Sequence, residues 1–537
     1  MCTASQSCAR PGKGLRWRPD NERAGNSPVT VNFRDGIVFP AATTLADKEF
    51  AFADHRAVYE HKSSEELLRS LVVLQLCASP LLVRHSGALL DALPWLREAL
   101  YRHFSVGHAP ADVWGRMNAL RANGVQAIMD FAEEDAGATA LSSTTTAGRL
   151  DVDAEAEAEA RYERRVAAFL SSIDTAATLQ SQGFAAVKLT ALADPAVLEA
   201  LAAATATAPA EPQPAEAQQQ AEQQQGPEAR LAPAQQAQLA ALMGRMDRLV
   251  ERALRKVRGG GGGGGGGGLQ TVVMPAGEGV KLMIDAELSH LRPAIDRLVH
   301  QLMAKHNRAA AAAGGDGAVI FITYQAYLRD VQPRLTADLE RAERQGYVLG
   351  AKLVGGVYLH LERRRAAERG EPAPVWDRAE DTYAAFDGCL EALLRAVRAG
   401  RAELMVGSHN QGSVQVAVTA MDRLGLDPAE SPVYFGQLLG MADNISFTLG
   451  QHGYKTFKYC PHGEPAKMRP YLSRRVLETQ YSVQGGRQDL RMLQAELWRR
   501  ISQDPAGQMA QLFGGGGGGA ASAGAGGAGK APQAAQQ

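Results

Sequence analysis

Cysteine is scarce in this sequence. There are five cysteines among 537 residues, and no two of them form a C-x-x-C pair. A thiolate zinc site needs closely spaced cysteines, and a small secreted scaffold needs a much higher density of them. We therefore expect free thiols in a reducing compartment and no structural metal.

Long hydrophobic runs and an excess of charge are also missing. No run reaches the roughly 18 apolar residues that span a bilayer. The best candidate, Leu71–Val83, contains Gln75 and Pro80, so we expect a buried helix that is broken at the proline. The formal net charge of -1 offers no electrostatic basis for binding nucleic acid or an anionic membrane.

Acidic residues are missing from the first 19 positions, which contain Arg10, Lys13, Arg16 and Arg18. Together with the nearby serines, this pattern is typical of an organelle transit peptide. Glycine and proline interrupt any amphipathic helix in the same stretch. We interpret residues 1–36 as either an organelle transit peptide or a disordered leader.

Three tracts of low complexity are present, at about residues 136–160, 209–268 and 506–537. The second includes a Gln-rich stretch, an amphipathic helix predicted over residues 239–257, and ten consecutive glycines. Glycine runs have high backbone entropy and no side chains to bury, so they predict flexible segments. No strand precedes the ten glycines, which excludes a dinucleotide-binding fingerprint there.

The remaining sequence predicts an α/β fold. Residues 37–124 form a helical arm in this interpretation, and eight apolar runs follow, separated by helical stretches. In chain order the runs are GVQAIMDF, FAAVKLTAL, VKLMIDAE, AVIFITYQ, GAKLVGGVY, ELMVGSHN, PVYFGQLLG and YKTFKYCPHG. Such runs are typical of a parallel sheet covered on both faces. Eight of them favour a (β/α)8 TIM-like barrel over residues 125–505, with a doubly wound sheet or two smaller α/β domains as alternatives.

Polar residues stand at the end of every run. They are Asp130, Lys188, Asp285 with Glu287, Gln325, Tyr358, His409 with Asn410, Gln437 and Tyr459. The chemistry of a (β/α)8 barrel lies at the carboxyl ends of its strands. This set brings together cations, aromatic rings and amides, without a nucleophile triad or a metal cluster. It suits a small anionic substrate and a flat organic cofactor.

Each of these residues also has a structural interpretation. Lys188 lies in an apolar run and is costly to bury unless it pairs, for example with Asp285. Its functional alternatives are a carboxylate ligand and a Schiff-base nucleophile. His409 and the tyrosines fit a core, Gln325 fits a partner for backbone groups, and Asp130 fits a loop anchor.

A further motif, YLSRRVLE, places Arg474 and Arg475 shortly before Glu478. On a helix this spacing gives surface ion pairs worth roughly 0.2–0.5 kcal/mol each. Paired guanidinium groups also match the two oxygens of a small carboxylate. The polar residues at the run ends favour this second interpretation.

Taken together, several motifs resemble the proline dehydrogenase family. They are KLTAL, LMIDAE, TYQAYL, KLVGGVY, SHN, YFGQLLGMADNISFTLGQ and YLSRRVLE, in the family's order between about residues 125 and 478. The resemblance implies a distorted barrel with non-covalent FAD, and oxidation of L-proline to 1-pyrroline-5-carboxylate by hydride transfer to flavin N5. It also implies a quinone electron acceptor and peripheral association with the matrix side of the mitochondrial inner membrane.

The resemblance assigns roles to individual residues. Those assigned to the substrate are Lys188, Arg474 and Arg475 for its carboxylate, and Tyr358, Leu438 and Tyr459 for its ring. Those assigned to the flavin are Gln325, Lys352, His409 and Glu478, and the supporting residues are Asp130 and Asp285. No side chain is assigned to the hydride transfer itself.

Three alternatives accompany this assignment. The first is hydroxyproline oxidation within the same family, against which the bulk of Tyr459 argues. The second is a Schiff-base lyase that uses Lys188. The third is a barrel that binds without catalysis because it lacks flavin, since Gly355 stands where the family usually has a basic residue.

Overall fold

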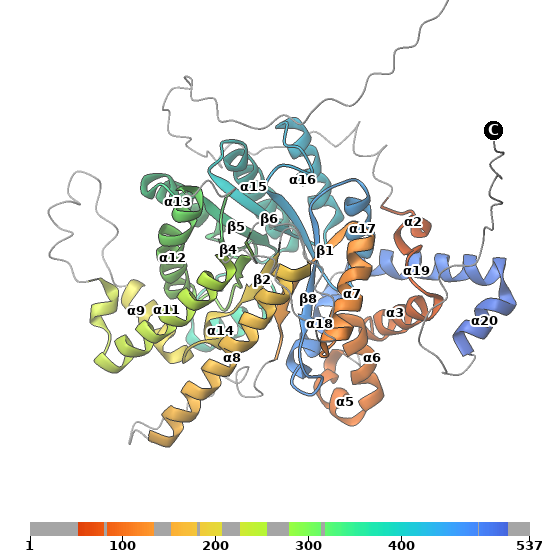
Figure 1. Cartoon of the computed structure of the whole chain (residues 1–537), viewed down its shortest axis with the longest axis horizontal. Helices are drawn as coiled ribbons and strands as arrows, with labels where there is room; N and C mark the ends of the chain where they lie inside the picture. The colour runs from red at the N-terminus through yellow and green to blue at the C-terminus, as the bar shows by residue number, and fades with distance from the viewer. Residues whose placement is uncertain are drawn as a thin grey trace, which may run out of the picture. The chain divides into compact units, whose positions relative to one another are not determined.

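A computed structural model describes residues 52–79, 83–133, 152–179, 183–206, 226–254, 279–312, 317–481 and 483–513 (Figure 1). The predicted leader and the ten-glycine run lie outside these residues. The rest comprises a barrel with its covering helices, and further helices before and after it.

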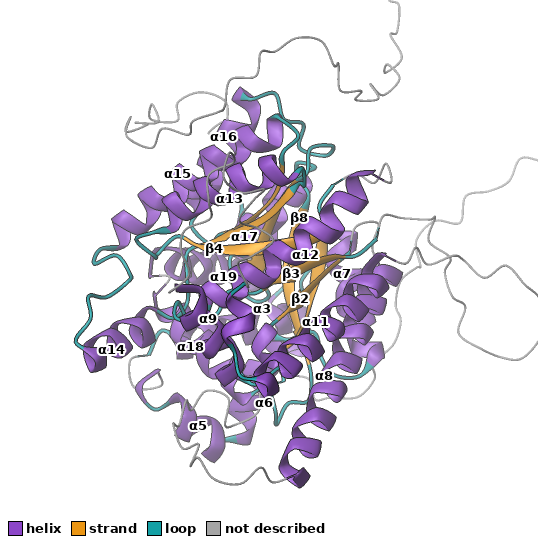
Figure 2. Cartoon of the chain, turned by 90° about the vertical axis from the view of Figure 1, so that its left-hand side faces the viewer, coloured by secondary structure: helices purple, strands orange, loops and turns teal. Residues whose placement is uncertain are grey.

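Eight parallel strands form a closed barrel, in which each strand pairs with the next and the last pairs with the first. They are β1 (Val125–Phe131), β2 (Phe184–Val187), β3 (Lys281–Ile284), β4 (Ile320–Gln325), β5 (Leu349–Val354), β6 (Ala402–Gly407), β7 (Val433–Leu438) and β8 (Thr456–His462). Figure 2 shows these strands in orange with helices around them. Each predicted run coincides with one strand, so the (β/α)8 barrel is confirmed and both alternative folds are wrong.

Large apolar side chains fill the inside of the barrel. Phe184 lies among them, with its ring 5.0 Å from the rings of both Tyr434 and Phe457 in edge-on contacts. Ile128 and Met283 belong to the same cluster. Side chains alternate along a strand, so residues two positions further on also point inward, nearer the carboxyl end. Two positions after Ile128, Met283 and Phe457 stand Asp130, Asp285 and Tyr459, which the next subsection describes.

Helices cover the outside of the barrel between successive strands. They are α8 (Val152–Leu179), α9 (Pro195–Ala206), α11 (Pro233–Leu254), α12 (Arg292–Ala312), α13 (Val331–Gln345), α14 (Leu359–Arg369), α15 (Ala379–Arg398), α16 (Gln411–Arg423) and α17 (Asp443–Gln451), with the short 3-10 turns η1 (Leu189–Ala191) and η2 (Pro227–Arg230). Both α13 and α14 end at a glycine with positive φ, Gly346 and Gly370, a common helix stop.

The structure differs from the predicted limits of the low-complexity tracts. Helix α8 begins at Val152, inside the first tract. Helix α11, inside the second, starts earlier than the amphipathic helix predicted from residue 239. Its Leu242 and Leu249 are fully buried, and its Arg245 pairs with Glu159 of α8. The tract therefore contributes a packed helix to the barrel, and α20 (Pro505–Phe513) likewise lies in the predicted tail.

The arm consists of α2 (His55–Tyr59), α3 (Ser64–Cys77), α5 (Ser86–Ala92), α6 (Pro94–Phe104) and α7 (Pro110–Ala122). A reciprocal capping box of Ser63 and Glu66 starts α3. No helix in the described part of the chain is long and apolar enough to cross a membrane.

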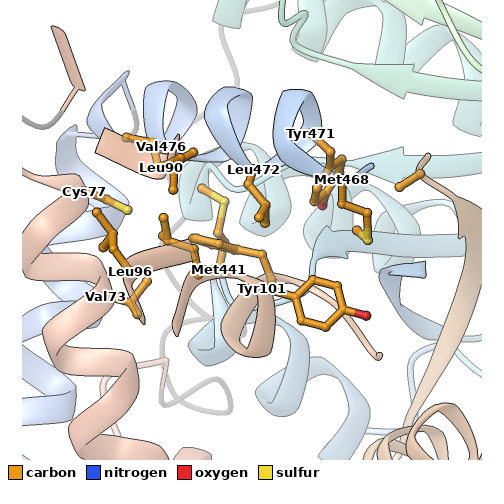
Figure 3. Close-up of a cluster of buried hydrophobic side chains, with 13 residues drawn as sticks. Val73, Cys77, Leu90, Leu96, Tyr101, Met441, Met468, Tyr471, Leu472 and Val476 are labelled. Carbon is orange, nitrogen blue, oxygen red and sulfur yellow. The ribbon is translucent and has the colours of Figure 1, made fainter. Parts of the chain in front are cut away.

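Two long helices follow the barrel, α18 (Arg469–Tyr481) and α19 (Val483–Gln503). The arm packs directly on α18 (Figure 3). Cys77 of α3 and Leu96 of α6 belong to the same buried cluster as Leu472 and Val476 of α18. One face of α18 is thus fixed by the arm, and its other residues are available to the barrel.

Candidate active site

Five predicted site residues, contributed by five different strands or the residues just after them, meet at the carboxyl end of the barrel. Asp285 accepts hydrogen bonds of 2.7 Å from the Lys352 ammonium and 2.7 Å from the Tyr459 hydroxyl. The Lys188 ammonium lies 3.7 Å from Asp285 and 3.6 Å from Asp130. The structural interpretation of Lys188 as the ion-pair partner of Asp285 is therefore confirmed, and the pairing also places this cation in the site.

Electrostatics fix the protonation of this cluster. Burial alone would raise the pKa of Asp285, but Lys352 and Lys188 hold it below its usual value. Burial, with the nearby Asp130 and Asp285, raises the pKa of Tyr459 well above normal. Asp285 is therefore ionised and Tyr459 is a neutral donor. The Lys352 ammonium also lies 5.0 Å from the centre of the Tyr459 ring, within cation–π range.

Helix α18 carries the arginine pair. Arg475 is buried and donates a 2.5 Å hydrogen bond to Glu478, one turn later. Its guanidinium lies 4.6 Å from the centre of the Tyr471 ring. Burial raises the pKa of Glu478, although Arg475 and Arg474 oppose the shift. The spacing of four and three residues places Tyr471, Arg475 and Glu478 on one face of the helix.

Two polar atoms on this face have no hydrogen-bond partner among the described residues. They are the Tyr471 hydroxyl and Arg475 Nε, and both are buried. Buried polar groups are nearly always satisfied, by protein, water or a ligand. Unpaired donors beside a fixed guanidinium are what a bound polar ligand would satisfy.

The ends of β6 and β7 lie against the same helix. The Leu438 backbone N–H donates to His409 Nε2 at 3.0 Å, so the proton of a neutral imidazole is on Nδ1. Burial, with Lys458 and Arg475 nearby, lowers the pKa of His409 to about 3. Leu438 itself packs against the cluster formed by the arm and α18. His409 is therefore uncharged and has one N–H to offer.

Gln325 and Tyr358 are positioned differently. Gln325 donates to the backbone carbonyl of Glu287 at 3.0 Å, so its amide also braces the loop after β3. Tyr358 is the N-cap residue of α14. It also lies near the hydroxyl of Tyr327, whose pKa is raised mainly by burial. The role of Tyr358 at the substrate ring stays a prediction.

Sequence reasoning missed Tyr471. It belongs to the YLSRRVLE motif, but no role was assigned to it. The structure places the Tyr471 ring beneath Arg475. Its hydroxyl also lies close enough to Tyr459 to add to the raised pKa of that residue. The available signal was its spacing of four residues before Arg475, which puts both on one helix face.

Comparison with known sequences decides the family. The sequence profile described as proline dehydrogenase matches residues 114–487. The chain belongs to the proline dehydrogenase family. This match covers the barrel, α18 and most of the last arm helix, α7, and it identifies the protein as an oxidoreductase of that family. The resemblance inferred from the motifs is confirmed.

Two curated relatives of this family member align with most of the chain and over most of their own length. The chain is 32% identical to human "Proline dehydrogenase 1, mitochondrial", over 84% of this chain and 89% of that one. It is also 32% identical to mouse "Hydroxyproline dehydrogenase", over 82% of this chain and 92% of that one. Overall identity therefore does not distinguish between the two ring substrates.

Among solved structures, the fold resembles proline utilization A (PutA) from Bdellovibrio bacteriovorus, inactivated by N-propargylglycine. The TM-score is 0.52 at 18% identity, over 87% of this chain and 41% of that longer chain. At this identity the likeness concerns the fold. It supports the barrel assignment independently of the motifs.

Proposed function

We propose that the protein oxidises L-proline to 1-pyrroline-5-carboxylate with FAD, as the first step of proline catabolism. The observation that carries this proposal is the buried Arg475 on α18, held by Glu478 and Tyr471 beside the Asp285 cluster. It offers a fixed cation to a small carboxylate, next to aromatic walls that suit a saturated ring.

Substrate binding is assigned to three cations. Arg474, Arg475 and Lys188 would receive the carboxylate, and each charge-assisted hydrogen bond contributes about 1.5–3 kcal/mol. The Glu478 pair fixes the rotamer of Arg475 before substrate arrives, so little entropy is lost on binding. Tyr459 and Leu438 would then enclose the ring.

The residues assigned to FAD fit an anionic, hydrogen-bonding cofactor. The Lys352 ammonium is held by Asp285. His409 accepts a hydrogen bond at Nε2, so its Nδ1–H can donate to the cofactor, and Gln325 lies at the same strand ends. FAD would supply the hydride acceptor for the ring carbon beside nitrogen. The contribution of the chain is alignment of the ring and exclusion of water, because no side chain needs to bond to the reacting carbon.

We further propose a quinone as the final electron acceptor, and the matrix side of the mitochondrial inner membrane as the place of action. The name of the human relative includes the word mitochondrial. The basic, acid-free first 19 residues agree with import into that organelle.

A spectroscopic titration tests the substrate and cofactor together. The full chain is purified, and its absorption spectrum is recorded before and after anaerobic addition of L-proline. We expect flavin bands that bleach with proline. Absence of flavin after FAD is supplied would contradict the cofactor, and bands that persist with proline would contradict the substrate.

Hydroxyproline is the second candidate substrate, because the similarity to hydroxyproline dehydrogenase is equally high. The Tyr459 ring, tied to Asp285, would crowd a ring hydroxyl. We expect Tyr459→Ser to raise kcat/KM for hydroxyproline relative to proline, and Tyr459→Phe to leave the ratio low. A wild-type enzyme that prefers hydroxyproline, or a serine variant without the gain, would contradict this steric account.

A further inference from the structure

The turn between β7 and α17, residues 438–443, has an unusual backbone. Ala442 has a φ of 51°, the one positive φ found at a non-glycine residue in the described part of the chain. Gly440 has a φ of 81° in the same turn. L-residues avoid this region, so the surroundings must hold the turn in place. It begins with Leu438, which is proposed to wall the substrate ring.

Lys458 of β8 holds the turn from the barrel side. Its side chain is completely buried, and its ammonium donates to the carbonyls of Met441 at 2.5 Å and Leu438 at 3.3 Å. It also pairs with Asp443 at 2.8 Å. With His409 bound to the Leu438 N–H, both backbone polar groups of Leu438 are fixed. A buried ammonium of this kind keeps its place only while Asp443 stays opposite it.

The arm holds the same turn from outside. The Lys62 ammonium, just before α3, binds the second oxygen of Asp443 at 2.5 Å. His103 of α6 hydrogen-bonds the Gly440 carbonyl at 2.9 Å. Burial, with Lys62 nearby, lowers the pKa of His103 to about 3, so its ring is neutral and Nε2–H donates. Two arm residues thus contact the turn of residues 438–443: Lys62 binds a side chain and His103 binds a backbone carbonyl.

Helix α19 completes the enclosure. Asp489 accepts a 3.1 Å hydrogen bond from the N–H of Ala442, the residue with positive φ. Arg500 on the same helix donates to the carbonyls of Tyr59 and Lys62, at 2.7 Å and 2.6 Å. Arm and C-terminal helix are therefore tied to each other around Asp443.

We propose that Lys62 is a positioning residue for the substrate pocket. By neutralising the outer oxygen of Asp443, it fixes the turn from residue 438 to 443 and so the place of Leu438 at the proposed substrate ring. The proposal deepens the proposed function, on which its kinetic test rests. It assigns to the arm a part in substrate binding, in addition to covering α18.

Three variants of the full chain test this role. Lys62→Met removes the charge, Lys62→Arg keeps it, and Arg69→Met is the matched control. Arg69 lies in the same arm with a similarly buried side chain, 22% exposed against 17% for Lys62, but it pairs with Glu65 and Glu66 inside α3. Proline kinetics, flavin content and amide hydrogen exchange over residues 438–443 are measured for each.

We expect Lys62→Met to raise the proline KM at least about fivefold while kcat stays within about twofold of the wild type. The reason is that a displaced Leu438 would hold the substrate ring less well. The flavin content should not change, exchange at residues 438–443 should rise, and Lys62→Arg should restore both KM and protection. Arg69→Met should change neither. An unchanged KM in Lys62→Met, or an equal rise in Arg69→Met, would overturn the proposal.

Hydrogen exchange separates this proposal from the proposed function. If the wild-type protein oxidises neither proline nor hydroxyproline, the proposed function fails, and exchange at residues 438–443 still decides whether Lys62 positions the turn. Exchange that is the same in Lys62→Met and wild type would overturn the positioning role even in an active enzyme.

Discussion

Arg475 is the residue on which carboxylate binding depends. We expect Arg475→Met to raise the proline KM by roughly 30-fold or more, because a buried charge pair that loses one partner costs about 2–5 kcal/mol. Glu478, whose side chain is only 17% exposed, would lose its 2.5 Å partner. Steady-state kinetics with a flavin assay measure the effect, and the flavin should stay bound.

Arg499→Met is the control for this change. Arg499 also pairs with a glutamate three residues away, Glu496, but on α19. Its loss should lower stability without altering the proline KM. Equal KM values in the Arg475 variant and the wild type would rule out the carboxylate assignment.

Gly355 and Gly356 are neighbours with opposite tolerance to side chains. A Cβ at Gly355 would meet no atom within 4 Å, whereas a Cβ at Gly356 would lie 2.3 Å from the Tyr327 ring, at a φ of 126°. The family usually has a basic residue at position 355. We therefore expect Gly355→Arg to fold normally and to bind FAD more tightly, as measured by equilibrium dialysis. Weaker binding would show that this position does not face the cofactor.

At the scale of elements, the strands were predictable and the contacts between distant elements were not. A strand buried on both faces leaves a continuous apolar run, and eight such runs indicated the barrel. Lys458 lies inside one of these runs, and the run does not tell which face a side chain occupies. Its partner Asp443 also binds Lys62, which is 381 positions away, so no local pattern connects them. Tyr471 is a mixed case, because its spacing from Arg475 was a local signal, whereas its closeness to Tyr459 of β8 was not.

The predicted limits of the low-complexity tracts were wrong for a different reason. Composition marks a tract as simple in sequence, but Ala, Gln and Glu are also good helix formers. In α11, Ala and Gln fill most of the first two turns, ahead of Leu242, Met246 and Leu249, whose buried side chains form the stripe that packs inward. Periodicity identified the helix, and composition hid its beginning at Pro233.

The turn after β7 makes a prediction about stability. Ala442 pays for a positive φ, and a left-handed residue with a Cβ costs roughly 1–2 kcal/mol. We expect Ala442→Gly to be neutral or to stabilise by up to about 1 kcal/mol, because glycine's greater freedom in the unfolded chain offsets part of the gain. Ala442→Val should destabilise. Chemical denaturation measures both, and a valine variant as stable as the alanine would contradict the strain.

At the scale of the whole molecule, residues near both ends of the described chain meet on the barrel. Lys62 precedes all barrel strands in the sequence and Arg500 follows them all, yet the Arg500 guanidinium donates a hydrogen bond to the Lys62 carbonyl. Lys62 also pairs with Asp443, and despite burial Lys458 and Lys62 hold the pKa of Asp443 far below normal. Asp489 interacts with the same three groups, so two carboxyl groups and two ammonium groups influence one another here. The stability of the fold should therefore depend on their ionisation.

Asp489 determines in which direction stability changes with pH. Burial, with Asp443 nearby, raises its pKa to about 7, although Lys458 and Lys62 oppose the shift. In the unfolded chain an aspartate has a pKa of about 4. Between these values the folded protein keeps a proton that the unfolded chain has lost, so this group makes stability fall as pH rises from about 4 to about 7. Above about 7 its contribution is constant.

Asp489→Asn removes this titration and keeps a side-chain oxygen for the Ala442 N–H. The free energy of unfolding is measured by urea denaturation at about pH 5 and about pH 8, for variant and wild type, so that all other titrations cancel. We expect the variant to lose about 1–3 kcal/mol less than the wild type between the two pH values. Glu380→Gln, an exposed acid far from the turn in sequence, should behave like the wild type. Identical pH dependence in Asp489→Asn and wild type would mean that Asp489 is ionised in the fold at about pH 5, and that the two lysines outweigh its burial.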